Sequence, residues 1–142
     1  RRFDFIKSEI EFLENHILGK SVDEVKSSPI LIRALERSYQ LIVEALADIA
    51  RHIVSSMGWS PCFTASECIE RLAERNVIPQ QLAEELIRRV KTRNILIHRY
   101  LEADYDELFS DTPKLIDLAR NFERHVAGFL RSIQPERLPA NV

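Results

Sequence analysis

Residues Ser28–Gly58 read SPILIRALERSYQLIVEALADIARHIVSSMG, the longest helical pattern in this chain. It predicts one long helix, because Ser28 is a favourable N-cap, Pro29 suits the first helical position and Gly58 favours a stop. The helix carries two adjacent core-facing stripes, Leu31, Leu35, Ser38, Ile42, Ala45 and Ile49, and Ile32, Tyr39, Val43, Leu46, Ala50 and Met57. Together they cover about half of the helix circumference, so we expect neighbours on two sides. One of these could be a second copy of the chain, which suggests a dimer.

Four further helices are predicted around this one, and no strand. They span about residues 3–18, 64–76, 79–101 and 111–133. Apolar residues spaced three and four apart define these segments, and Thr64 with Glu67 forms a capping box at the start of the short one. Short connections between long helices predict an all-α fold, an antiparallel bundle of about five helices. We expect residues 1–133 to form a single domain and residues 134–142, with two prolines, to form a loose tail.

Composition excludes several classes of protein. The chain has 142 residues, 45% of them hydrophobic and 30% charged, with three glycines, which indicates one ordered helical domain. No apolar run approaches the roughly 18 residues of a membrane span, and no signal-peptide pattern is present, so we expect a cytoplasmic protein without membrane contact. Cys62 and Cys68 are expected to be reduced thiols. No metal site or cofactor is expected, because ligand clusters and a glycine-rich phosphate loop are lacking.

Eight residues, Arg93–Tyr100 (RNILIHRY), place polar groups on the fourth predicted helix. The apolar face of that helix is defined by Leu82, Ala83, Leu86, Ile87, Val90, Ile97 and Leu101. On an ideal wheel Arg93 falls inside the apolar arc beside Tyr100, whereas Asn94 and His98 line its opposite edge. An unpaired polar group removed from water costs a few kcal/mol, so something must compensate these side chains. A polar cavity, a subunit interface or an active site would do so.

The chemistry of these residues suits phosphate. A histidine can give or take a proton at neutral pH, so His98 is a candidate general acid or base. Arg93 could grip a phosphate and stabilise its developing charge, and Asn94 could orient the ring of His98 or a phosphate oxygen. Around an ideal helix Arg93 and His98 differ by about 140°, which a long side chain or a site across a dimer axis would resolve. A purely structural polar network is the alternative.

Basic residues gather around this segment although the net charge is −2. A net negative charge argues against a protein that coats nucleic acid generally. Arginine favours two-point contacts with phosphate, so the cluster is a weak candidate for RNA binding; it comprises Arg88, Arg89, Lys91 and Arg99. A solvated face of mixed charge is the alternative. Glu44 and Asp48, on the polar face of the long helix, are interpreted as solvated ion-pairing residues.

RNILIHRY resembles the signature of HEPN-domain proteins of the HepT toxin group, an arginine, four residues, a histidine, any residue and a tyrosine. Three other segments occur in the order found in that group. They are ERSYQLIVEA at 36–45, SPCFTASE at 60–67 and VIPQQLAE at 77–84. The resemblance covers nearly the whole chain.

The resemblance implies a helical bundle that forms a homodimer, with motif residues of two subunits facing a shared cleft. It also implies a metal-independent endoribonuclease, the toxin of a toxin–antitoxin pair, with RNA as substrate. Arg93 and His98 would be catalytic and Asn94 supporting. The implied partner is an MNT-type nucleotidyltransferase antitoxin that AMPylates Tyr100.

Other interpretations of the same residues stay open. The chain could be a catalytically silent HEPN module that binds a nucleotide or serves as the partner of a nucleotidyltransferase. It could also be a dimerisation bundle whose polar motif residues satisfy one another. Tyr100 on its own would be a packing residue with a solvated hydroxyl.

Overall fold

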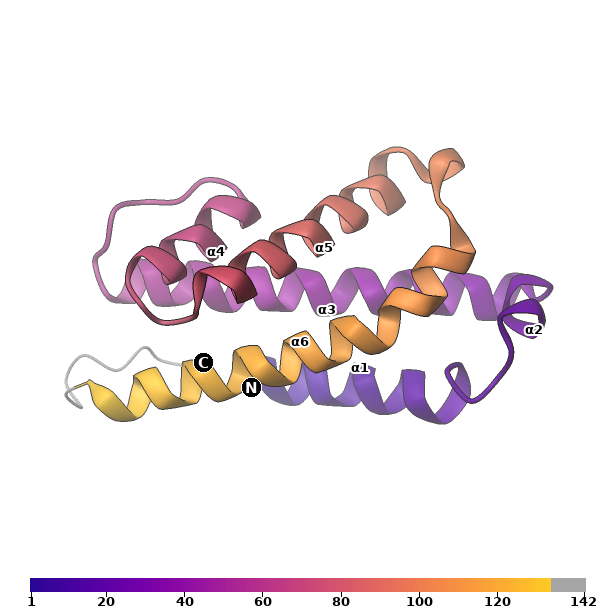
Figure 1. The fold of residues 1–142 in the computed structure, drawn as a ribbon, viewed down its shortest axis with the longest axis horizontal. Helices are drawn as coiled ribbons and strands as arrows, with labels where there is room; N and C mark the ends of the chain where they lie inside the picture. The colour runs from indigo at the N-terminus through magenta and orange to yellow at the C-terminus, as the bar shows by residue number, and fades with distance from the viewer. Residues whose placement is uncertain (134–142) are drawn as a thin grey trace.

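The computed structural model describes residues 1–133, so the predicted tail at 134–142 lies outside the described residues. Its elements are α1 (Arg2–His16), α2 (Val22–Lys26), α3 (Pro29–Ser56), α4 (Ala65–Glu74), α5 (Gln80–His98), the 3₁₀ turn η1 (Tyr100–Glu102) and α6 (Tyr105–Ser132). The predicted all-α class is therefore confirmed for these residues. Figure 1 shows α3 running through the middle of the bundle, with α1 and α6 on one side and α4 and α5 on the other. None of the described helices is long and apolar enough to cross a bilayer.

The central helix α3 begins and ends as its sequence predicts. The Ser28 hydroxyl accepts the N–H of Leu31 at 3.2 Å, and Gly58 has a φ of +69° just beyond the helix. Both of its stripes are covered within one chain, because α3 contacts each of the other five α-helices among the described residues. The two stripes of α3 therefore need no second copy to cover them, and a dimer stays a prediction.

A short helix, α2, lies between the first two predicted helices, where none was expected. Ser21 and Glu24 form a complete capping box there, in which each side chain accepts the backbone N–H of the other residue. Val25 anchors the helix, since its side chain is fully buried in the core. A helix of five residues is too short to show apolar periodicity, which is why the sequence pattern missed it.

Helix α6 begins at Tyr105, before the predicted start at Asp111. Asp104 is its N-cap, and the Asp104 carboxylate accepts the N–H of Glu107 at 3.1 Å. Pro113 lies inside the helix, although proline usually marks a helix start because it lacks an N–H. The prediction placed the start of this helix at Asp111, whereas the structure places Asp111 inside the helix and gives its carboxylate a partner on another helix.

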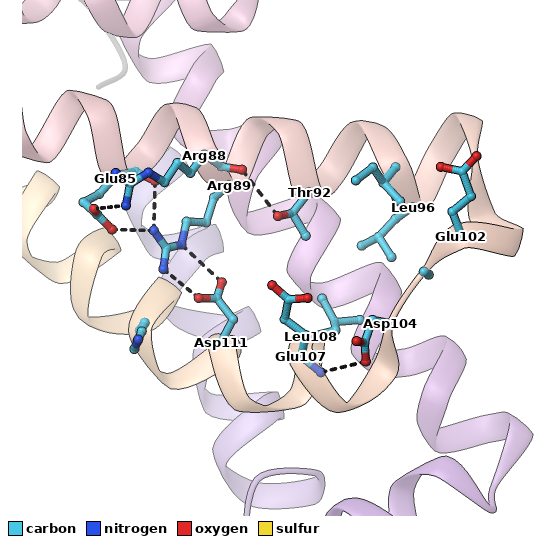
Figure 2. Close-up of a pocket in the computed structure, with 13 residues that line it drawn as sticks. Glu85, Arg88, Arg89, Thr92, Leu96, Glu102, Asp104, Glu107, Leu108 and Asp111 are labelled. Carbon is cyan, nitrogen blue, oxygen red and sulfur yellow. Dashed lines mark hydrogen bonds and ion pairs between the residues drawn. The ribbon is translucent and has the colours of Figure 1, made fainter.

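That partner is Arg89 of α5, whose side chain is 9% exposed. Arg89 Nη2 donates to Asp111 Oδ1 at 2.6 Å and Nε to Oδ2 at 3.1 Å (Figure 2). The Tyr39 hydroxyl of α3 donates to the same Oδ2 at 2.8 Å. Arg89 Nη1 also contacts Glu85 at 2.6 Å. Burial opposes the charge of Arg89, but the hydrogen bonds to Asp111 and Glu85 outweigh it and raise the pKa of Arg89. The network ties α3, α5 and α6 together.

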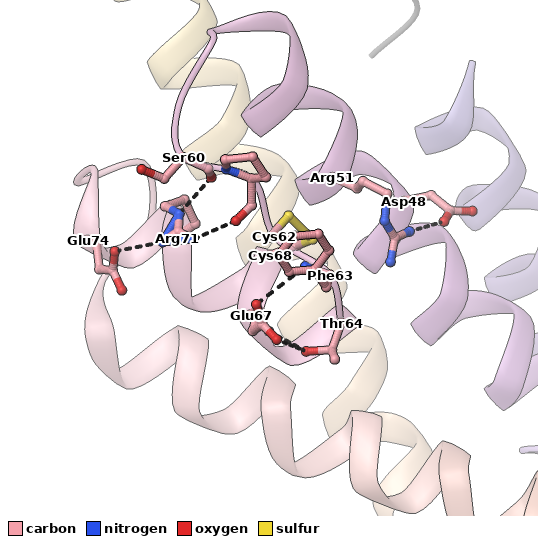
Figure 3. The surroundings of a disulfide bond; sticks show 11 residues. Asp48, Arg51, Ser60, Cys62, Phe63, Thr64, Glu67, Cys68, Arg71 and Glu74 are labelled. Carbon is pink, nitrogen blue, oxygen red and sulfur yellow. Dashed lines mark hydrogen bonds and ion pairs between the residues drawn. A yellow bond between two sulfur atoms is a disulfide. The ribbon is translucent and has the colours of Figure 1, made fainter.

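Cys62 and Cys68 form a disulfide, so the prediction of reduced thiols was wrong. Thr64 caps α4 by accepting the N–H of Glu67 at 3.1 Å, as predicted. The predicted capping box is incomplete, because the Glu67 carboxylate accepts the N–H of Phe63 and not that of Thr64. The chain before Thr64 lies beside α4 (Figure 3). The two Cα atoms are 5.1 Å apart, within the span of a disulfide. Arg71 holds the same loop by donating to two of its carbonyl oxygens. Composition alone carries no information about this local approach of the two cysteines.

Candidate active site

Helix α5 carries the first six residues of the motif and ends within it, at His98. Arg99 has φ −135° and ψ 48°, and its N–H makes the last bond of the helix, to the carbonyl of Ile95 at 2.9 Å. The helical wheel therefore does not extend to Tyr100 and Leu101, which lie in η1 and are 62% and 88% exposed. Placing Leu101 on the apolar face, and Tyr100 in the same arc as Arg93, was wrong because the backbone leaves the helical conformation at Arg99.

The Arg93 side chain is 17% exposed and has partners inside the chain. Its Nε donates to Asn94 Oδ1 at 3.0 Å, and its Nη1 lies 3.9 Å from Glu44 Oε1 on α3. Glu44 Oε1 in turn accepts a hydrogen bond from Gln40 Nε2 at 3.1 Å. The compensation that Arg93 requires thus comes from a carboxylate of the neighbouring helix and from an amide of its own helix.

His98 and Asn94 are exposed at the C-terminal end of α5. His98 needs no buried partner, because the helix ends there and leaves its side chain in contact with solvent. The Asn94 carbonyl is turned toward Arg93, whereas the sequence left open whether it orients His98 or a phosphate oxygen. Arg93 and His98 are five positions apart on one helix, so a single α5 presents them about 140° apart.

The four basic candidates for RNA binding divide into two groups. Lys91 is exposed, and the side chains of Arg88 and Arg99 are 69% and 61% exposed. Arg88 contacts Glu85 at 2.7 Å and Arg99 contacts Glu102 at 3.6 Å, both pairs of neighbouring residues at the surface. Arg89 is the exception, since it is buried against Asp111 and cannot reach a bound nucleic acid without breaking that pair.

A cavity of about 320 Å³ lies between α5 and α6 and is not lined by any of Arg93, Asn94, His98 and Tyr100. Figure 2 shows Arg88, Thr92 and Glu107 around it, with the Arg89–Asp111 pair at one end. A second cavity, of about 270 Å³, lies between α1 and α3 and is lined by Glu44. Glu44 therefore stands between this second cavity and Arg93. Within residues 1–133 no group of three or more histidine, cysteine or acidic side chains is placed to hold a metal ion.

Residues 6–125 match the sequence model of the family described as Ribonuclease HepT-like. The chain belongs to this family. The predicted resemblance to the HepT group is confirmed by that match. This HepT-like chain is 26% identical over 116 residues to the tRNA nuclease HepT of Aphanizomenon flos-aquae, covering 82% of the chain and 79% of that protein. It is 27% identical over 114 residues to a putative RNase of Archaeoglobus fulgidus, covering 80% of the chain and 86% of that protein.

The HepT-like fold also resembles a solved structure of the tri-AMPylated HEPN toxin of Shewanella oneidensis in complex with an MNT antitoxin. The TM-score is 0.82 at 23% sequence identity, with 89% of this chain and 94% of that chain covered. At this level of identity the likeness establishes the fold, and the HEPN-type bundle is thereby confirmed.

Glu44 and Gln40 are the neighbours of the site that sequence reasoning missed in this HepT-like chain. Glu44 was interpreted as a solvated residue, whereas the structure pairs it with Arg93. Asp48, interpreted in the same way, does form an exposed pair with Arg51 at 3.0 Å. A signal was available, because Glu44 interrupts an apolar run from residue 41 to residue 47, and a charge in such a run requires a partner.

Proposed function

We propose that this chain is the toxin of a toxin–antitoxin pair and acts as a metal-independent endoribonuclease in the cytoplasm. One observation carries the proposal: in a HepT-like chain, the guanidinium of Arg93 is held by Asn94 and Glu44 on the helix that ends with exposed His98. Cleavage of a phosphodiester requires a cation and a proton-transferring group at one phosphate, and this helix carries one of each. The names of the two relatives, a tRNA nuclease and a putative RNase, support the same activity.

The proposed reaction needs neither a protein nucleophile nor a metal. The 2′-hydroxyl of the RNA attacks the adjacent phosphorus, and the bond from phosphorus to the 5′-oxygen breaks. His98 transfers protons to or from the reacting oxygens, Arg93 stabilises the charge on the pentacoordinate phosphate, and Asn94 supports Arg93. The products carry a 2′,3′-cyclic phosphate and a 5′-hydroxyl.

We propose that residues 1–133 act as one domain and that two copies complete the site. Arg93 and His98 of a single helix point about 140° apart, so a second subunit would bring an Arg93 and a His98 to the same phosphate. Apolar side chains beside the motif are available for such an interface, since Ile97 is 38% and Leu101 is 88% exposed. Burying them against a second copy would remove this apolar surface from water.

RNA would reach the site along the exposed basic residues next to it. Lys91, Arg88 and Arg99 are the proposed contacts, because all three side chains are at the surface. Arg89 is left out of this surface because it is buried and paired. Contacts of this kind attract RNA through its phosphates and weaken as salt rises.

The proposed antitoxin is an MNT-type nucleotidyltransferase that transfers AMP to the hydroxyl of Tyr100. Tyr100 is 62% exposed in η1, two residues beyond His98, where an enzyme can reach its hydroxyl. AMP attached there would add bulk and negative charge at the end of α5 and compete with the phosphate of the substrate. The AMPylated HEPN toxin of similar fold, in complex with its MNT antitoxin, supports this assignment.

The test is growth after induced expression of the chain alone, at matched protein levels. Wild type should arrest growth, and Arg93→Ala and His98→Ala should relieve the arrest. Arg120→Ala is the matched control, because it removes an exposed arginine paired with Glu14 on the far helices and should stay toxic. Purified protein should cleave RNA in the presence of EDTA. Harmless expression of folded wild type would favour the catalytically silent HEPN module instead.

A further inference from the structure

We propose that Glu44 is a positioning residue for Arg93, holding its guanidinium in the orientation in which it meets the phosphate. This inference rests on the proposed function of Arg93 and deepens it. Glu44 lies on α3, and Arg93 on α5, so the contact joins the catalytic helix to the central helix of the bundle.

The contacts of Arg93 leave one of its three guanidinium nitrogens, Nη2, for a ligand. Nε donates to Asn94 Oδ1 at 3.0 Å, and Nη1 lies 3.9 Å from Glu44 Oε1. Among the described residues Nη2 has no hydrogen-bond partner. A guanidinium with one nitrogen hydrogen-bonded and a second facing a carboxylate samples fewer orientations, and the third nitrogen can then donate to a phosphate oxygen after a shorter search through side-chain rotamers.

Glu44 is itself held in place. Gln40, one turn earlier in α3, donates from Nε2 to Glu44 Oε1 at 3.1 Å. The same carboxylate oxygen therefore faces both Gln40 and Arg93. The four side chains form a row, Gln40, Glu44, Arg93 and Asn94, in which each contacts the next.

Compensation of the Arg93 charge accounts for only part of this contact. The Glu44 carboxylate is 34% exposed and the separation of 3.9 Å is at the limit of an ion pair, so its contribution to the free energy of unfolding is small. We infer that Glu44 aligns Arg93 for charge stabilisation, because the rate of a reaction falls steeply when a catalytic group is misplaced by even a short distance.

The chain offers a matched control one turn along the same helix. Asp48 lines the same cavity between α1 and α3 as Glu44, but it pairs with Arg51 and not with Arg93. Both residues are acids on one face of α3. Removing Asp48 therefore reproduces the change in charge without touching the motif.

The first readout is cleavage of purified tRNA by the full chain. Glu44→Ala should lower kcat by roughly tenfold or more while KM changes little, because the group aligned by Glu44 acts in the transition state. Asp48→Ala should cleave at the wild-type rate, and both variants should melt at the wild-type temperature. Equal rates for Glu44→Ala and Asp48→Ala would overturn the proposal.

The second readout does not depend on catalysis. In an NMR spectrum of ¹⁵N-labelled protein, the signal of the Nη1–H of Arg93, the nitrogen that faces Glu44, is assigned by its disappearance in Arg93→Lys. A held guanidinium gives a signal that exchanges slowly with water, and in Glu44→Ala it should exchange at least several-fold faster, with no change in Asp48→Ala. An unchanged signal in Glu44→Ala would overturn the proposal even if the wild type cleaved RNA. If exchange is faster in Glu44→Ala but the wild-type protein cleaves no RNA, Glu44 positions Arg93 and only the proposed ribonuclease function is refuted.

Discussion

Arg89 of α5 and Asp111 of α6 form a two-point ion pair, with Nη2–Oδ1 at 2.6 Å and Nε–Oδ2 at 3.1 Å. The same carboxylate accepts the hydroxyl of Tyr39 from α3. Arg89 precedes Arg93 by one helical turn. The pair therefore sets the position of the motif helix against two of its neighbours, and it does so with charges that are largely out of water.

Breaking this pair from one side should destabilise the protein strongly. Asp111→Ala leaves the Arg89 charge buried without its carboxylate, and we expect the free energy of unfolding to fall by about 3–5 kcal/mol in urea denaturation. Arg89→Met combined with Asp111→Leu should recover most of that loss, since neither charge remains. Arg88→Ala, which removes an exposed pair with Glu85, should cost less than about 1 kcal/mol. A loss in Asp111→Ala no larger than in Arg88→Ala would contradict this account.

Alkaline pH should act through Tyr39. Burial, and then the negative charge of Asp111, raise the pKa of Tyr39 far above its usual value. A raised pKa gives stability that is fully present below the unfolded-state value near 10 and is lost as pH rises toward the folded-state value. Above about pH 10 the free energy of unfolding should fall by up to about 1.4 kcal/mol per pH unit from this group. Tyr39→Phe should lack this part of the slope in urea denaturation between pH 8 and pH 11; parallel curves would argue against it.

Reduction of the disulfide should loosen the start of α4. The bond closes a loop with a sequence separation of 6 residues, for which chain entropy predicts a stabilisation of about 2 kcal/mol. We expect wild type to lose about this amount when dithiothreitol is added during urea denaturation. A variant with Cys62→Ser and Cys68→Ala should be insensitive to the reductant. If wild type were equally insensitive, the two thiols would not be joined in solution.

Modification by the proposed antitoxin should depend on Tyr100. Co-expression of the two proteins should add the mass of AMP to wild type, measured by mass spectrometry of the intact chain. Tyr100→Phe should lack the modification at this site, because it lacks the attacking hydroxyl. Tyr105→Phe is the matched control, since Tyr105 lies five residues further on, in the first turn of α6, and is partly buried. Loss of AMP from Tyr105→Phe, and not from Tyr100→Phe, would place the modification elsewhere.

Long periodic segments made most of the fold predictable. The cap at Ser28, the stop at Gly58 and the stripes of α3 follow from residues close together in sequence. Short or interrupted elements could not be predicted in this way. Helix α2 has too few residues to show a period, and Pro113 resembles a helix start although it lies inside α6. Local preferences cannot show that Asp111 binds a residue 22 positions away and lies inside the helix that it was expected to start.

The site was predictable as far as the motif extends along one helix. The spacing indicated that Arg93 needs a partner, and it could not identify Glu44, because that partner lies on another helix whose register only packing determines. Extending the helical wheel past His98 gave wrong positions because of a local change in the backbone. Arg99 leaves the helical conformation, so Tyr100 and Leu101 do not lie where the wheel places them.

The end of α5 at His98 separates the motif into two parts with different architecture. The interval from Arg93 to His98 is set by the rigid rise of a helix, whereas the interval from His98 to Tyr100 is set by a short turn. Insertions or exchanges confined to residues 99–104 would thus redirect the tyrosine without disturbing the arginine and histidine. Loop grafts in this segment offer a route to test whether the proposed antitoxin recognises the turn, while Arg93 and His98 keep their spacing.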